Sequence, residues 1–280
     1  MSQTSSKINL ILGVKLKTHR KDDDASLEAD AAFREIHGKV LKRDNMTCQG
    51  CGMKTKAAAS RPSGGFEAHH IDDDHANNAP ENLVTLCPFC HAVFHVGNAG
   101  NRDVGSIIWL PGISQADLNI LCHVLFILMR QGEMTLRDER SRGGRVDGDR
   151  DQVGKRAKAD TLAIQADNGQ DDVVRCGRLA RDCYEILASY KDEAVRHLGP
   201  GMDSAEYFGK ALAYFARKYP KEYEKRARFM AGARFLPRYE AYPDQIEHWR
   251  KSSNYPEPLI AAHMLPVMLS DFKERARDAG

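Results

Sequence analysis

The first part of the chain alternates between helical and extended spacing of its hydrophobic residues. Between Ser26 and Lys42, apolar residues recur every three or four positions among charged ones, which predicts an amphipathic helix. The stretch 54–65 is rich in Ala, Ser, Pro and Gly and has no period, so a loop is expected there. Extended segments are expected at 66–71 and 81–86 on either side of a polar turn, and a helix follows at 91–95.

Beyond this unit, the pattern predicts a turn, a strand and a long helix. Three glycines between 97 and 105 predict the turn, and the apolar run 106–110 predicts a strand that ends at a Pro-Gly pair. Ser114 and Asp117 form a capping pattern for the helix, and His123 inside it is expected to be a hydrogen-bonded core residue. The expected core face of the helix carries Leu118, Leu121, Cys122, Leu125 and Met129.

The second half of the chain differs in composition from the first. From Gly132 to Asp172 the sequence is crowded with Arg, Asp and Gly and is nearly free of aromatic residues, which predicts a linker or a mobile insertion. From Val173 to the end, helical runs are separated by prolines, which predicts a largely helical region. We therefore expect an α+β fold with three parts, 1–131, 132–172 and 173–280.

Composition excludes two broad classes of protein. The chain has 280 residues, of which 42% are hydrophobic and 29% charged, and its mean hydropathy is -0.53, which is too polar for a membrane protein. The first residues lack the pattern of a secretory signal, so we expect a cytoplasmic protein with no membrane span. A net charge of +2 supplies no global field for nucleic acid, so any such binding requires a local patch.

One stretch of the helical region has the composition of such a patch. Basic residues between 218 and 238 alternate there with tyrosines and phenylalanines, which is typical of a surface for nucleic acid or an acidic partner. Glu222 and Glu224 dilute the charge, so we favour the interpretation of this stretch as a solvated helix face.

Cysteine spacing points to a metal. Four of the seven cysteines form two Cys-x2-Cys pairs, Cys48/Cys51 and Cys87/Cys90, and such pairs in a reducing compartment are typical zinc ligands. The short spacing brings two thiolates from one tight turn to one tetrahedral ion. The alternative is four buried thiols that never meet. The lone cysteines, which we expect in the core, are Cys122, Cys176 and Cys183.

Histidines and an asparagine accompany the cysteines. His91 and His95 are four residues apart on a predicted helix, so they project from one face, and a histidine from the facing strand completes a site with three ligands. A divalent ion held there would polarise a phosphate, while a neutral imidazole nearby would accept a proton from water. The full set, in chain order, is Cys48, Cys51, His69, His70, Asn82, Cys87, Cys90, His91 and His95.

This order and spacing resemble the zinc-containing HNH nuclease family, whose fold is a ββα-metal finger. The resemblance implies that 1–131 is an HNH-like zinc-binding domain in which the four cysteines hold structural zinc. It implies that His69, His91 and His95 hold a second divalent ion, Mg2+, Mn2+, Ni2+ or Zn2+. In an active enzyme, His70 is then the general base and Asn82 orients the loop between the strands.

The charge of the predicted hairpin argues against nuclease activity. The chain has no Lys or Arg between Arg61 and Arg102, whereas five acidic residues lie there. Phosphate binding draws its affinity from nearby cations, so such a hairpin is poorly suited to hold DNA alone. Basic residues earlier in the chain could fold beside it, namely Lys42, Arg43, Lys54, Lys56 and Arg61. The alternative is a zinc finger that needs only its cysteines, in which the histidines cap the site or donate to backbone carbonyls. Apart from Asp72, Asp73 and Asp74, the acids are Glu67 and Glu81.

A second resemblance lies outside the finger. The stretch 108–126, with 235–237 and 245–249, is similar to the IcmJ/DotN family of type IVB secretion and related conjugation systems. It implies a cytoplasmic zinc protein at the periphery of an inner-membrane complex, where its partners are a coupling ATPase and the adaptor proteins of that ATPase. Well-known members of that family keep the cysteines without the paired histidines.

The preferred function is therefore a structural or adaptor role in a type IVB secretion or conjugation coupling complex. The alternative is an active, metal-dependent HNH endonuclease that cleaves phosphodiester bonds of DNA with His70 as the general base.

Overall fold

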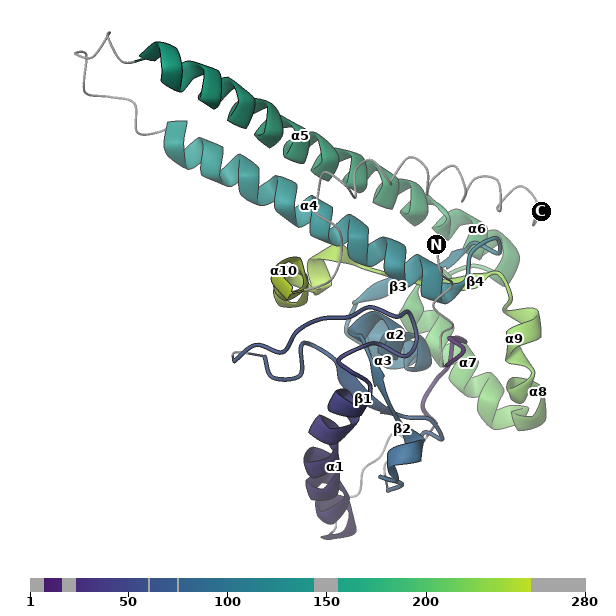
Figure 1. The fold of residues 1–280 in the computed structure, drawn as a ribbon. Coiled ribbons are helices and arrows are strands. Elements are labelled where there is room, and N and C mark those ends of the chain that lie inside the picture. Colours follow the sequence, from purple (N-terminus) through teal and green to yellow (C-terminus); the bar gives the residue numbers. More distant parts are fainter. Residues whose placement is uncertain (1–7, 17–23, 60, 75, 144–155, 253–280) are drawn as a thin grey trace.

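The computed structural model describes residues 8–16, 24–59, 61–74, 76–143 and 156–252. Within these residues the fold is α+β, as predicted, with two small antiparallel sheets among helices (Figure 1). None of the described helices is both long and apolar enough to cross a bilayer.

The predicted order of strand, loop, strand and helix is confirmed in the first part of the chain. Strand β1 (Glu67–His70) pairs with β2 (Leu83–Leu86) in antiparallel register, and helix α2 (Pro88–Phe94) follows. A single 3-10 turn, η1 (Pro80–Asn82), enters β2. The predicted amphipathic helix is α1 (Asp24–Arg43), and it lies against both strands of this sheet.

Asp44 and Arg43 hold the end of α1 to the sheet. The Asp44 carboxylate accepts a hydrogen bond from the Thr85 amide at 2.9 Å, and Arg43 donates to the Leu83 carbonyl at 2.7 Å. Burial acts to raise the pKa of Asp44, but the hydrogen bonds from Arg43 and Thr85 outweigh it and lower this pKa below its usual value. The cysteine loop that follows α1 is thereby held beside β2.

The prediction of a glycine-rich turn at 97–105 is wrong for the first part of this range. Residues Val96–Asn101 form helix α3, and only Gly105 begins the next strand. Gly209 of helix α7 approaches this helix so closely that a Cβ added to Gly209 would lie 2.4 Å from the Gly97 Cα. The glycines here permit two helix backbones to touch instead of forming a turn.

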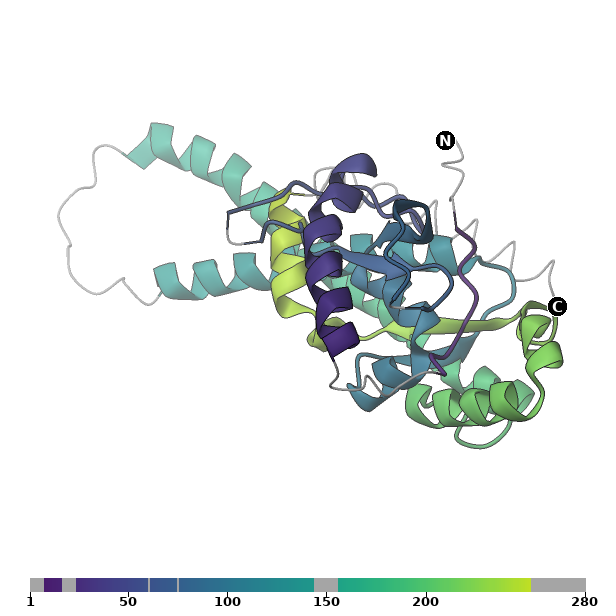
Figure 2. The same cartoon turned by 90° about the horizontal axis from the view of Figure 1, so that it is seen from below.

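The range 132–172, predicted to be a linker or a mobile insertion, is helical wherever the structure describes it. Helix α4 (Gln115–Gly143) continues through its first twelve residues, and helix α5 (Arg156–Ser189) already contains its last ones. The two helices form an antiparallel hairpin that extends away from the rest of the chain (Figure 2). Gly132 and Gly177 face each other across it, because a Cβ on Gly132 would lie 3.1 Å from the Gly177 Cα. Residues 144–155 lie outside the described part.

The start of α4 agrees with the sequence. The Ser114 hydroxyl accepts from the Asp117 amide at 3.1 Å and donates to the Asp117 carboxylate at 2.7 Å. All five residues of the predicted core face of α4 are buried.

A second sheet joins the two halves of the chain. Strand β3 (Gly105–Trp109) pairs with β4 (Ala233–Pro237), and Ile107 lies opposite Phe235. The sequence predicted a largely helical region after 173 and did not indicate the strand β4. The other elements of this part are α6 (Lys191–Leu198), α7 (Ala205–Lys218), α8 (Pro220–Glu224), α9 (Arg226–Phe229), η2 (Tyr239–Ala241) and α10 (Pro243–Ser252).

The sheet of β3 and β4 contains one strand from each half of the chain, which is relevant to the predicted division into three parts. The expected boundaries at 131 and 172 fall inside α4 and α5, and the residues on either side of them contribute to one core. The division into separate domains stays a prediction.

Candidate metal centres

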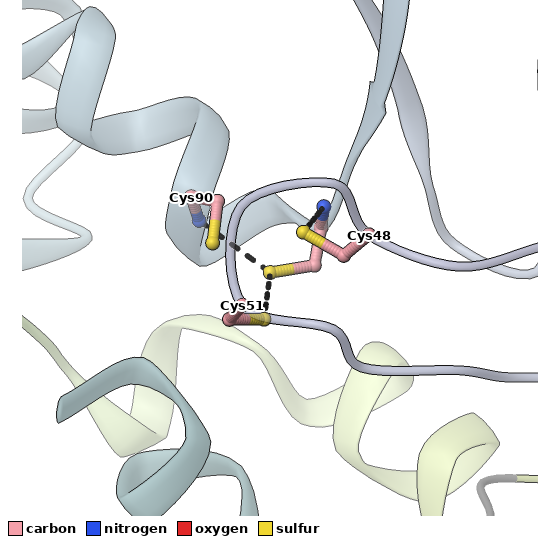
Figure 3. Close-up of side chains that lie close together, drawn as sticks. Cys48, Cys51 and Cys90 are labelled. Carbon is pink, nitrogen blue, oxygen red and sulfur yellow. Dashed lines mark hydrogen bonds between the residues drawn. The ribbon is translucent and has the colours of Figure 1, made fainter. Parts of the chain in front are cut away.

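Two turns bring the four paired cysteines together. Cys48 and Cys51 lie in the loop after α1, whereas Cys87 caps the N-terminus of α2 and Cys90 lies in its first turn (Figure 3). All four are buried free thiols, and their sulfur atoms lie within 4.8 Å of one another.

Glycine makes this approach sterically possible. A Cβ on Gly50 would lie 3.0 Å from the Cys90 sulfur and 2.9 Å from the Leu10 side chain, so a larger residue would displace the turn. Gly52 has a φ of 79°, in the left-handed region that favours glycine. Backbone amides also point at the sulfurs, since the Cys87 N–H donates to Cys48 Sγ at 3.2 Å.

The spacing of the sulfurs fits a tetrahedral ion. Four thiolates about 2.3 Å from a zinc ion are about 3.8 Å from one another, and the Cys51 and Cys87 sulfurs are 3.8 Å apart. Burial raises the pKa of Cys87 and of Cys90, and the thiols of Cys48 and Cys51 reinforce this effect on both. A dication compensates the cost of burying several thiolates. The cluster is therefore able to hold a metal ion.

Two polar residues of α4 complete the surroundings of the sulfurs. Asn119 donates its amide N–H to Cys90 Sγ at 3.2 Å, and the Nε2 of His123 lies 3.4 Å from Cys87 Sγ. Both side chains are fully buried. The prediction that His123 is a hydrogen-bonded core residue is confirmed, but its sulfur partner was missed. The signal in the sequence is a pair of polar residues four positions apart on the apolar face of a helix.

A second group of potential ligands comes from β1 and from the C-terminal part of α2. His69 on β1, His91 on α2 and His95 at the end of α2 have ring nitrogens within 4.8 Å of one another. His95 is not inside the helix as predicted, because it occupies the junction between α2 and α3. Burial, reinforced by the charge of His91, lowers the pKa of His69 to about 3 and that of His95 to about 2. Neutral imidazoles are the form that binds metal ions.

Glu67 orients this group and was missed as a site residue. Its carboxylate lies 2.9 Å from the Nδ1 of His91, which leaves Nε2 as the ligand atom. The buried part of the half-exposed Glu67 side chain acts to raise its pKa, but the hydrogen bond and charge of His91 outweigh this effect and lower the pKa. A carboxylate behind a histidine is a common arrangement around protein-bound metal ions.

His70 lies beside the three histidines in a cavity of about 210 Å3 that they share. Its Nε2 is 3.0 Å from the Asn78 side-chain oxygen, and its ring stacks on Phe33 at a centroid distance of 5.1 Å. With this oxygen as the acceptor, Nε2 carries the proton and Nδ1 is the basic nitrogen.

Asn82 contacts the loop between the two strands. Its amide donates to Asp72 at 2.8 Å and to the Asn77 carbonyl at 2.9 Å, and its side-chain oxygen accepts from the Asp72 N–H. The carboxylates of Asp72 and Asp74 accept further amide bonds within the same loop.

Besides Arg43 at the end of α1, a cation from a distant segment of the chain lies near the hairpin of β1 and β2. A second cavity of about 350 Å3 shares His69 and Asp73 with the first and is lined by Tyr223 and Arg226. The Arg226 guanidinium lies over the Tyr223 ring and donates to the Leu12 carbonyl. The sequence analysis did not connect Arg226 with the hairpin because this residue is about 150 positions away along the chain.

Fold and site define an α+β protein in which a ββα unit carries a buried four-cysteine cluster able to hold a metal ion. No family model matches the chain. Over 99 residues it is 38% identical to the Type 4 apparatus protein DotN of Legionella pneumophila (strain Philadelphia 1), a stretch that covers 35% of this chain and 43% of the relative. The predicted resemblance to the IcmJ/DotN family is confirmed over that stretch, and the chain matches less than half the length of this relative.

Proposed function

We propose that this chain is a zinc-containing structural component of a type IV secretion or conjugation apparatus. The observation that carries the proposal is its 38% identity to DotN over 99 residues, together with the buried cluster of four cysteines. In this proposal Cys48, Cys51, Cys87 and Cys90 hold one zinc ion. The ion fixes the loop after α1 to the first turn of α2.

The zinc also fixes the finger to the rest of the chain. Asn119 and His123 extend the metal site into α4, the first helix of the long hairpin. A rigid junction of this kind presents the helical surfaces to partners without catalysis. The partners in this proposal are a coupling ATPase and its adaptor proteins, at the cytoplasmic side of an inner-membrane complex.

Metal analysis tests the zinc site. We expect about one zinc per purified chain, and Cys87→Ser should lose the metal and much of the soluble protein. Cys176→Ser is the matched control, since Cys176 lies on α5 outside the cluster. A Cys87→Ser protein with full zinc content would reject the assignment.

Copurification tests the role in secretion. The full chain should copurify with the soluble tail of a coupling ATPase from the same genome, and Cys87→Ser should bind it less because the finger is unfolded. No association of the folded wild-type chain with that ATPase or its adaptors would reject the role.

The three-histidine group supports a second candidate function, a metal-dependent HNH endonuclease. The observation in favour is that His69, His91 and His95 lie together in one cavity with His70, and Glu67 orients His91. A divalent ion there would stabilise the leaving oxygen of a phosphodiester. His70 would accept a proton from the attacking water at Nδ1, and Asn82 would hold the loop that carries Asp72 and Asn77.

Plasmid nicking separates the two functions. If the chain is a nuclease, it nicks plasmid DNA with added Mg2+, Mn2+, Ni2+ or Zn2+, and His70→Ala lowers the rate by about 10²–10⁴-fold. The exposed His197→Ala is the control and should cleave at the wild-type rate. We favour the secretion role because the similarity to DotN supports it and because the hairpin of β1 and β2 is acidic. Nicking that His70→Ala abolishes would overturn that preference.

A further inference from the structure

Helix α7 carries two exposed tyrosines on the side that faces away from the core. Tyr207 is 60% exposed and Tyr214 62% exposed, and they are seven residues apart, so they lie on one face about 10.5 Å from each other along the helix axis. The opposite face is buried and carries Ala205, Phe208, Gly209, Leu212 and Ala216. The tyrosines are therefore not needed for packing.

Each of these tyrosines is paired with a lysine. The Lys210 ammonium lies 5.6 Å from the centre of the Tyr207 ring, and the Lys218 ammonium lies 5.4 Å from that of Tyr214. Lys218 also donates to the Tyr214 hydroxyl at 3.1 Å. The same combination of one ring and one cation is thus repeated two helical turns apart.

Positive charge is concentrated around this face. Residues 205–230 contain seven Lys and Arg side chains and three Glu, a net charge of +4, whereas the whole chain has +2. Lys210 is paired with Glu206, but among the described residues no carboxylate forms an ion pair with Arg217 or Lys218.

Helices α8 and α9 follow α7 (Figure 1), and the basic residues at 221–228 lie in these helices and between them. Tyr219 and Phe229 are further exposed rings there. Tyr223 and Arg226 then line the second cavity, which includes His69.

We propose that the face formed by Tyr207, Lys210, Tyr214, Arg217 and Lys218, the α7 face, binds single-stranded DNA. Bases of a single strand are free to stack on exposed rings, while the cations beside each ring attract the phosphates. The bases of a duplex are stacked on each other and would leave both rings unused. An acidic peptide would use the cations but would offer the rings no flat partner. The proposal goes beyond the secretion role and does not require cleavage.

Fluorescence anisotropy of a labelled thymidine oligonucleotide of about 20 nucleotides tests the proposal. The full-length chain is titrated without added divalent ions, at about 50 and 200 mM salt. We expect wild-type binding that weakens with salt. Tyr214→Ala should lower the affinity about tenfold because a stacked base is lost, and Tyr214→Phe should retain it. Lys218→Gln should reduce the salt slope by about 0.7.

Two variants control for general effects of surface mutations. Ile186→Ala removes another exposed apolar side chain, on α5, and Lys39→Gln removes an exposed lysine on α1; both should bind like wild type. Circular dichroism melts verify that every variant is folded.

Four results would overturn the proposal. The first is that the wild type does not bind at the lower salt, and the second is that a protein with both Tyr207→Ala and Tyr214→Ala binds with wild-type affinity. The third is that a duplex of the same length competes equally well. The fourth is that a polyglutamate peptide at equal charge displaces the oligonucleotide. The last of these would assign the face to an acidic partner instead.

Discussion

The sulfur of Cys90 is held by a residue that no cysteine motif includes. Asn119 donates an amide hydrogen to this sulfur, and it also accepts a hydrogen bond from Gln115 at 2.9 Å. Gln115 in turn donates to the Phe235 carbonyl of β4. A single chain of hydrogen bonds therefore connects the cysteine cluster to the second sheet.

Asn119→Asp should weaken metal binding with little change in side-chain volume. The substitution replaces a donor by a carboxylate beside a thiolate, and changes around metal ligands typically cost about 10–100-fold in affinity. The measurement is the rate and extent of zinc transfer to a chromogenic chelator. Asn101→Asp, at the exposed end of α3, is the control and should release zinc like wild type. Equal release from Asn119→Asp and wild type would contradict this role.

Single residues of the site differed in how well the sequence revealed them. Spacing was enough to group Cys48 with Cys51 and Cys87 with Cys90, because two ligands in one turn are a local pattern. Glu67 gave no such signal, since its partner is 24 positions away. The helix pattern marks Asn119 as a buried polar residue, but it does not reveal its partner Cys90, 29 positions away. Interactions of this kind depend on how the elements pack, which local pattern does not determine.

At the level of elements, helix packing depends on glycines that face other backbones. Gly209 on α7 faces Gly97 on α3, and Gly100 on α3 faces the start of α7. Without side chains at these positions the helices approach closely, and α7 is held beside the finger.

Gly209→Ala should destabilise the protein by about 1–3 kcal/mol, because its methyl group would overlap the backbone of Gly97 and neither helix can yield cheaply. Thermal unfolding followed by circular dichroism measures the loss. Gly38→Ala on α1 is the matched control: a Cβ there meets nothing within 4 Å, and alanine in a helix gains about 0.5–1 kcal/mol over glycine. A Gly209→Ala protein as stable as wild type would show that the two helices are free to move apart.

Elements with strong local signals were predicted well, and those determined by distant contacts were not. The capped start of α4 and the strand at β3 follow from local sequence. Helix α3 was mistaken for a turn because its glycines serve contacts with α7, and β4 was missed because its partner strand is 128 positions away. The helical hairpin of α4 and α5 was interpreted as a linker or a mobile insertion because its charged composition resembles that of a disordered segment.

On the scale of the whole molecule, the cysteine cluster and the C-terminal helices share one core. Phe89 of α2 packs edge-on against Trp249 of α10 with centroids 5.2 Å apart, and Trp249 also contacts His123 at 4.5 Å. Trp249 is fully buried. A chain cut after Met129 would therefore lose β4 and this tryptophan, and we do not expect it to fold independently.

Metal removal should accordingly unfold more than the finger. Zinc binding is coupled to folding, and without the ion the buried thiols lose the charge that holds them together. Because His123 joins Cys87 to Trp249, chelation should expose this tryptophan and shift its fluorescence to the red, while the thermal transition of the whole chain moves to lower temperature. Trp109→Phe makes Trp249 the sole tryptophan of the chain for this measurement. If the metal leaves while Trp249 stays buried and the transition is unchanged, the finger is independent of the helical core.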